Sequence, residues 1–347
     1  MGEDRISNLP DEILHRILSL VPAKCAMSTC ILSKRWKYVS NSISTLDFRK
    51  WRTQKPFSEE GKLETKSFKN FLDTVVFLHE KPNIQKFYLD LNEDFDESQV
   101  FRWVSNIIKR KVEEFYLYMT YSRTSCIFPL SFFTYDSLTL LDLSFDNDVV
   151  EATVEIYAPN LLTISYIAVA TNDFPLSSFP SLEEAKIRFD LRDCDEYDIL
   201  NEVCVKIFEK FSSAKLLKIC AELFLVLNES DIQLNNSLTF NNLIHLEGCK
   251  IAFVEDDDYW SLPKCLSPHL RAIKFKIFGS QLMDLNTIKL FLKNGRFLES
   301  VTIEASRRLS EDHLRQNSVM KQLLMFPKPP NCVVKFLTSS EDTQHYF

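Results

Sequence analysis

The chain has 347 residues, of which 45% are apolar, and a formal net charge of −7 at pH 7 without a basic arm or stripe. That length and apolar content are enough for two globular domains, or one domain with a small appendage, and the acidic balance argues against a nucleic-acid partner. Only five glycines occur and the closest two, Gly279 and Gly295, are 16 positions apart, which excludes the glycine-rich phosphate loops of nucleotide-dependent enzymes.

The first 50 residues predict three short helices. Pro10 stands at a first helical position, two acidic residues follow it, and apolar residues at helical spacing continue until Pro22 ends the helix. A second helix is expected over about 23–30, and a third begins with Ser33 as its N-cap. Three helices of this size cannot bury a large core, so we expect the unit to dock on something else.

Residues 51–65 are polar and are expected to form a linker. Apolar residues at helical spacing then predict an amphipathic helix over 68–78 and another around 103–108.

From Ile84 to Ile303 the chain repeats a short pattern, with apolar residues at positions 0, 3 and 5 of each unit. Nine units occur at a mean spacing of about 27 residues. A strand and a return segment at a period of ~20–29 residues is the leucine-rich-repeat pattern. The usual Asn at the eighth position is present only in the first unit, at Asn92, so we expect an irregular solenoid. The alternative is nine unrelated strands of an α+β domain.

Three N-terminal strings closely resemble an F-box: Ile6 to Leu14, Ile17 to Pro22, and Leu32 to Trp36. The tail from Pro268 to Ile303 is similar to an FBD segment, and the whole chain resembles plant F-box/FBD/leucine-rich-repeat proteins. The resemblance implies an α/β chain in which a short all-α F-box of three helices precedes an irregular leucine-rich-repeat solenoid closed by an FBD segment. The expected divisions are an F-box at 1–50, a linker and amphipathic helix at 51–83, repeats at 84–267, and the FBD segment with the last repeats at 268–340.

This resemblance also implies a function. Such proteins are substrate-recognition subunits of Skp–cullin–F-box ubiquitin ligases, in which the F-box binds a Skp-type adaptor and, through it, cullin. The repeats then hold a protein for ubiquitination, whose identity the sequence does not reveal. The alternative is a scaffold that binds the adaptor and a partner protein without causing degradation.

Some F-box residues are candidates for contact with the adaptor. Carried over by position, they are Leu9, Pro10, Ile13, Ile17, Leu18, Leu20, Pro22 and Trp36. The alternative, strongest for Trp36, is that they pack the three helices together.

The residues between the apolar positions of each repeat should share one face of the sheet, because side chains alternate along a strand. This face changes from aromatic and acidic in the early repeats to mainly basic in the later ones. The candidates for substrate contact are Tyr88, Tyr116, Tyr118, Lys186, Arg188 and Lys218. An apolar or aromatic element of the substrate is expected near the tyrosines, and an acidic or phosphorylated one near the cations. Alternatively, the tyrosines cover the sheet beneath the N-terminal helices and the cations are ordinary solvated charges.

No arrangement in the sequence predicts catalysis. None of the six histidines has a second His or Cys at metal-ligand spacing, and no Gly-x-Ser-x-Gly elbow occurs. We expect no catalytic residue, no metal site and no cofactor, and hence a non-catalytic protein.

The cysteines and the hydropathy pattern bear on the compartment. The nine cysteines are dispersed, without a Cys-x-x-Cys pair, which indicates reduced thiols. The first residues do not resemble a secretory signal, and no stretch approaches the ~18 consecutive apolar residues of a membrane span. We expect a protein of the nucleus and/or cytoplasm with no membrane partner.

Overall fold

The computed structural model describes residues 6, 8–49, 58–79, 82–91, 95–120, 133–134, 136–146, 156–169, 179–190, 206–220, 223, 240–249, 269–277 and 282–338. These residues form two compact units, one up to Leu161 and the other from Leu162 onward. Asn92 lies outside the described residues.

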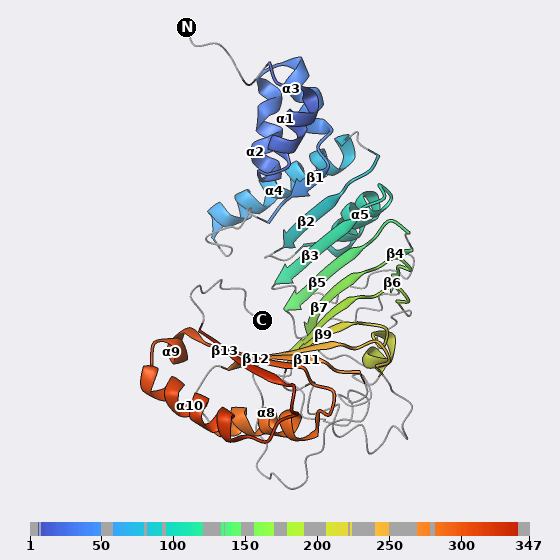
Figure 1. Ribbon diagram of the computed structural model, residues 1–347. Coiled ribbons are helices and arrows are strands. Elements are labelled where there is room, and N and C mark those ends of the chain that lie inside the picture. The colour runs from blue at the N-terminus through green and yellow to red at the C-terminus, as the bar shows by residue number, and fades with distance from the viewer. Residues whose placement is uncertain are drawn as a thin grey trace. The chain divides into compact units, whose positions relative to one another are not determined.

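The first unit begins with short helices (Figure 1). In chain order they are α1 (Asp11–Leu18), α2 (Ala23–Ser28), the 3-10 helix η1 (Thr29–Ile31) and α3 (Lys34–Asn41). Pro10 is the N-cap of α1 rather than its first residue. The Ser33 side chain accepts a hydrogen bond from the Trp36 backbone N–H, which makes Ser33 the expected N-cap of α3.

Two longer helices follow in this unit, α4 (Glu59–Leu78) and α5 (Glu97–Ile108). Residues 59–65 therefore form the start of a helix and not a linker, which corrects the prediction. The reason is local: the Ser58 side chain accepts from the Gly61 backbone N–H, and two acidic residues occupy the positive first turn. The two helices are joined by a hydrogen bond of 2.6 Å from the indole Nε1 of the fully buried Trp103 to Asp73 Oδ1.

Parallel strands complete the first unit. Its sheet has the order β1-β2-β3-β5, made of β1 (Thr45–Asp47), β2 (Lys86–Leu91), β3 (Glu114–Thr120) and β5 (Leu140–Asp146). A separate short pair joins β4 (Phe133–Thr134) to β6 (Ile156–Tyr157). One face of the main sheet carries an aromatic core in which Phe87 stacks on Phe115 with ring centroids 5.5 Å apart.

The second unit continues the same architecture in parallel strands with the order β7-β8-β9-β10-β11-β12-β13. The strands are β7 (Thr163–Val169), β8 (Glu184–Asp190), β9 (Leu216–Cys220), β10 (His245–Cys249), β11 (Ala272–Ile277), β12 (Ser300–Ala305) and β13 (Val333–Thr338). Its helices are α8 (Leu282–Asn294), α9 (Arg307–Ser310) and α10 (His313–Met325), and residues 206–210 are also helical. Phe275 of β11 contacts Phe291 of α8, with ring centroids 5.6 Å apart.

The strands follow the periodic pattern of the sequence. Each of the nine predicted units contains one of the parallel strands β2, β3, β5 and β7–β12. Every apolar residue at positions 0, 3 and 5 is buried except Gly248, which is partly exposed. The side chains that alternate with these positions along the strands are mostly partly exposed, although Asp90 and Ser165 among them are buried, and they share the opposite face of the sheet.

Several elements were not expected, among them the short strand pair of β4 and β6 and the helix α9. The edge strands β1 and β13 fall outside the nine units, and α8 carries too weak a periodicity to stand out. Among the described helices, none is both long enough and apolar enough to cross a membrane.

Candidate protein-binding surfaces

The N-terminal helices expose large apolar side chains. Ile13 and Ile17, one turn apart on α1, are 43% and 42% exposed, and Leu20 just after the helix is 82% exposed. Ile31 and Leu32, at the end of η1, are 84% and 64% exposed. Apolar side chains left in water in this number on so small a unit are typical of a protein-binding surface.

The remaining adaptor candidates divide by burial. Leu9 and Pro22 are partly exposed and Pro10 is exposed. Leu18 and Trp36 are buried, so the structure places them in the core of the helical unit and not on its surface. For Trp36 this agrees with the alternative that it packs the helices together.

An arginine ties the start of α1 to α3. Arg35 forms an ion pair of 2.7 Å with Asp11 and also donates to the backbone carbonyl of Leu9. These contacts connect α3 to the residues just before Ile13.

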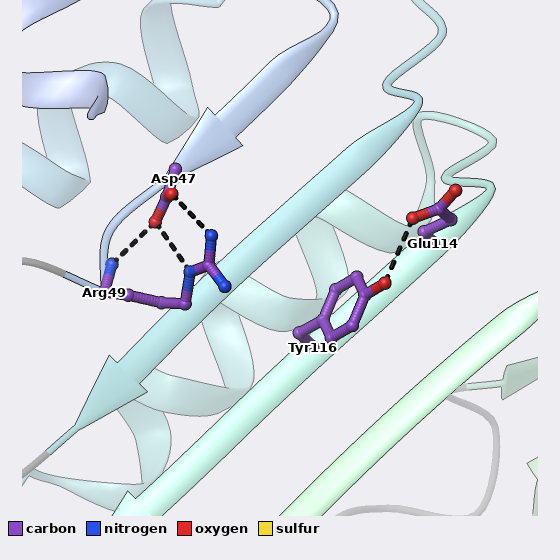
Figure 2. A network of polar contacts seen from close by, with 4 residues as sticks. All are labelled: Asp47, Arg49, Glu114 and Tyr116. Atoms are coloured by element: carbon purple, nitrogen blue, oxygen red, sulfur yellow. Dashed lines mark hydrogen bonds and ion pairs between the residues drawn. The ribbon is translucent and has the colours of Figure 1, made fainter. Parts of the chain in front are cut away.

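The polar side of the first unit's sheet carries what we call the tyrosine face. Its members are Asp47, Arg49, Lys86, Tyr88, Asp90, Glu114, Tyr116, Tyr118 and Asp142. Register places Tyr88 beside Tyr116, and their rings stack with centroids 4.2 Å apart. The Tyr116 hydroxyl donates to Glu114 at 3.1 Å, as Figure 2 shows.

A second set of contacts organises the rest of this face. The Arg49 guanidinium bonds both oxygens of Asp47, at 3.1 and 2.8 Å (Figure 2), and lies 3.9 Å from the centre of the Tyr88 ring. The Tyr118 hydroxyl donates to Asp142 Oδ2 at 2.8 Å. The three predicted tyrosines therefore lie side by side on β2 and β3 and are partly exposed.

Two tyrosines and two cations of the tyrosine face have raised pKa values. Burial raises the pKa of Tyr118, and the negative charge of Asp142 raises this pKa further. Burial also raises the pKa of Tyr116. The hydrogen bonds to Asp47 and Glu114 raise the pKa of Arg49 and of Lys86, respectively. The Tyr116 and Tyr118 hydroxyls therefore remain donors, and Arg49 and Lys86 remain charged, over the physiological pH range.

In the second unit, lysines and glutamates alternate across five strands, in what we call the ion-pair ladder. It consists of Glu184, Lys218, Glu247, Lys274 and Glu304, on β8 to β12 in turn. Successive charged atoms lie 2.5, 3.9, 3.7 and 2.8 Å apart. Lys218, one of the predicted cations, is thus held between two carboxylates.

The other two cationic candidates, Lys186 and Arg188, lie on β8 and are partly exposed. They are on the same strand face as Glu184.

Sequence reasoning missed several residues of these surfaces. Ile31 and Leu32 could have been found as an apolar pair directly after the second helix. Asp47 and Arg49 precede the first repeat and gave no periodic signal. Glu247 and Glu304 occupy the same alternate strand positions as the lysines that were singled out, so the signal was present. No group of three or more His, Cys, Asp or Glu side chains in the described part of the chain is arranged to hold a metal ion.

Comparison with known protein families matches the F-box domain over residues 6–47 and the FBD over residues 259–303. The chain carries an F-box domain and an FBD. The F-box match contains all of the exposed apolar residues described above.

Curated relatives agree with this assignment. A putative FBD-associated F-box protein of Arabidopsis thaliana is 34% identical over 152 residues, which are 43% of this chain and 33% of the relative. Another FBD-associated F-box protein of that plant is 39% identical over 142 residues, 40% of this chain and 33% of the relative. An Arabidopsis F-box/LRR-repeat protein is 29% identical over 271 residues, 74% of this chain and 50% of the relative. The chain thus spans a third to a half of the length of these relatives, and the predicted resemblance to plant F-box proteins of this kind is confirmed.

Proposed function

We propose that this F-box protein is the substrate-recognition subunit of a Skp–cullin–F-box ubiquitin ligase in the nucleus and/or cytoplasm. The observation that carries the proposal is the set of exposed apolar side chains within the F-box match, at Ile13, Ile17, Leu20, Ile31 and Leu32. These side chains would become buried on a Skp-type adaptor, which in turn links the chain to cullin.

In this proposal the parallel strands are leucine-rich repeats of an irregular solenoid, which the FBD segment closes. The regular spacing of the units and the burial of their apolar positions support it. The polar face of the strands would hold the protein to be ubiquitinated. The receptor itself catalyses nothing and contributes proximity, which raises the effective concentration of substrate lysines near the charged ubiquitin carrier.

The test is a pair of double variants of the full chain. Ile13→Asp with Ile17→Asp places two charges in the proposed interface and should abolish co-purification of a Skp-type adaptor and of cullin. The matched control is Leu63→Asp with Leu78→Asp, because these α4 residues are 66% and 61% exposed apolar side chains outside the F-box match. The proposal is contradicted if the variant with Ile13→Asp and Ile17→Asp still captures the adaptor. It is also contradicted if the control variant loses adaptor capture to the same extent.

The degradative role needs a separate measurement. Proteins that co-purify with the chain in the presence of a cullin inhibitor should have longer half-lives when the chain is deleted. Unchanged half-lives with adaptor binding intact would favour the non-degradative scaffold.

A further inference from the structure

On the tyrosine face, a tyrosine ring and a carboxylate together already bind one cation of the chain itself. Arg49 lies against the Tyr88 ring at 3.9 Å while Asp47 binds its guanidinium through two hydrogen bonds. A tyrosine ring together with a carboxylate supplies both cation–π attraction and charge-assisted hydrogen bonds. This combination is suited to a guanidinium or an ammonium group.

The same pair of groups recurs on the neighbouring strands without a cation. Asp142 of β5 accepts from the Tyr118 hydroxyl through Oδ2. Its Oδ1 is buried and has no hydrogen-bond partner, and Asp142 forms no ion pair among the described residues. A buried carboxylate oxygen without a partner is costly, and a nearby positive charge would reduce that cost.

Each of the two cations on the face forms its ion pair with a carboxylate other than Asp142. Lys86 forms its ion pair with Glu114 at 2.9 Å, and Arg49 forms its own with Asp47 at 2.8 Å. Asp47 and Glu114 on this face therefore form ion pairs, whereas Asp142 forms none among the described residues.

Each of the three carboxylates of the ion-pair ladder in the second unit, by contrast, forms an ion pair with a lysine. The lysines of the ladder alternate with glutamates from β8 to β12, so each charge already has partners in the chain. Charge complementarity therefore favours the tyrosine face as the place where a charged partner gains most, and it favours a positive partner.

We propose that the tyrosine face binds a basic segment of a partner protein, with an arginine or lysine side chain placed beside Tyr118 and Asp142. This inference rests on the proposed function, because it names the class of substrate that the receptor would take. It places a cationic side chain where the sequence suggested an apolar or aromatic element of the substrate.

The test measures peptide binding to the folded full chain by fluorescence anisotropy at about 0.15 M salt, where long-range attraction is screened. The probes are a fluorescein-labelled hexa-arginine peptide and a hexaglutamate peptide with the same label. We expect binding of hexa-arginine only, weakened at least fivefold by Asp142→Asn and also weakened by Tyr118→Ala. The matched control is Glu247→Gln, which removes the same charge by the same isosteric change from the ion-pair ladder and should alter the affinity less than twofold.

The outcomes separate the two proposals. No binding of hexa-arginine, equal weakening by Asp142→Asn and Glu247→Gln, or preference for hexaglutamate would each overturn the basic-segment proposal. Adaptor capture is measured on the same preparations, since Asp142 lies outside the F-box match. If the chain captures the adaptor but does not bind the peptide, the proposed receptor function is retained and the basic-segment proposal fails. If it binds the peptide but does not capture the adaptor, the receptor function fails and only the peptide site is supported.

Discussion

Two adjacent residues of α1 allow folding and binding to be tested separately. Leu18 is 4% exposed and Ile17 is 42% exposed, although both are apolar and share one helix. Truncating a buried leucine to alanine costs about 2–5 kcal/mol, whereas an exposed substitution usually changes stability by about 0.5 kcal/mol or less. Leu18→Ala should therefore destabilise the helical unit, and Ile17→Ala should leave it intact.

The expected effect on binding is different for the exposed residue. If Ile17 becomes buried on an adaptor, its truncation should lose about 1–2 kcal/mol of apolar contact, which is about a 5–30-fold rise in Kd. Hydrogen exchange of residues 11–41, followed by mass spectrometry, measures the local stability. Biolayer interferometry with a purified Skp-type adaptor measures the affinity.

Each measurement has a result that refutes the reasoning. Equal loss of exchange protection in both variants would mean that Ile17 belongs to the core. An unchanged Kd for Ile17→Ala would remove this side chain from the binding surface. Unchanged protection in Leu18→Ala would contradict its place in the packed interior.

Three further predictions concern stability. Trp103→Phe removes the indole N–H that donates a hydrogen bond to Asp73. The free energy of unfolding, measured by urea denaturation, should fall by about 1–2 kcal/mol. A smaller change would mean that water replaces this hydrogen bond without penalty. Because the pKa of Tyr118 is raised above its ordinary value of 10.0, the folded protein keeps this proton while the unfolded chain loses it. The free energy of unfolding should therefore fall as pH rises above 10.0, and less steeply in Tyr118→Phe; identical pH profiles would contradict the shift. Gly295→Ala should destabilise by about 1–3 kcal/mol, because its Cβ would lie 2.7 Å from the Phe291 carbonyl oxygen and 2.3 Å from Leu298 Cδ1. Gly248→Ala is the control, since its nearest contact would be 3.6 Å away, and equal melting curves for the two variants would refute the clash.

Much of the fold could be predicted because it depends on patterns within short segments. The alternation of apolar residues located nine strands and their buried side chains, and the Ser33 cap located the start of α3. Prediction was wrong at the start of α4, where the local cap at Ser58 outweighed a polar composition. It also missed β1 and β13, because an edge strand is defined by its neighbour as much as by its own residues.

The candidate surfaces could be predicted only as lists of residues. Both Leu18 and Ile17 fit the apolar pattern of α1, and only the packing of the other helices against α1 decides which one is buried. The lysines of the later strands could be listed from the sequence as well, but Glu247 and Glu304, which pair with them, were not singled out.

Periodicity and local capping therefore sufficed for the secondary structure and for the two faces of each strand, since side chains alternate along a strand wherever it lies. The charge character of those faces depended on tertiary structure. Tyr118 meets Asp142 across 24 positions of sequence, and Lys218 meets Glu184 across 34. Such partners are set by the register between parallel strands, which the connecting segments and the packed core determine together, and no local pattern in the sequence encodes it.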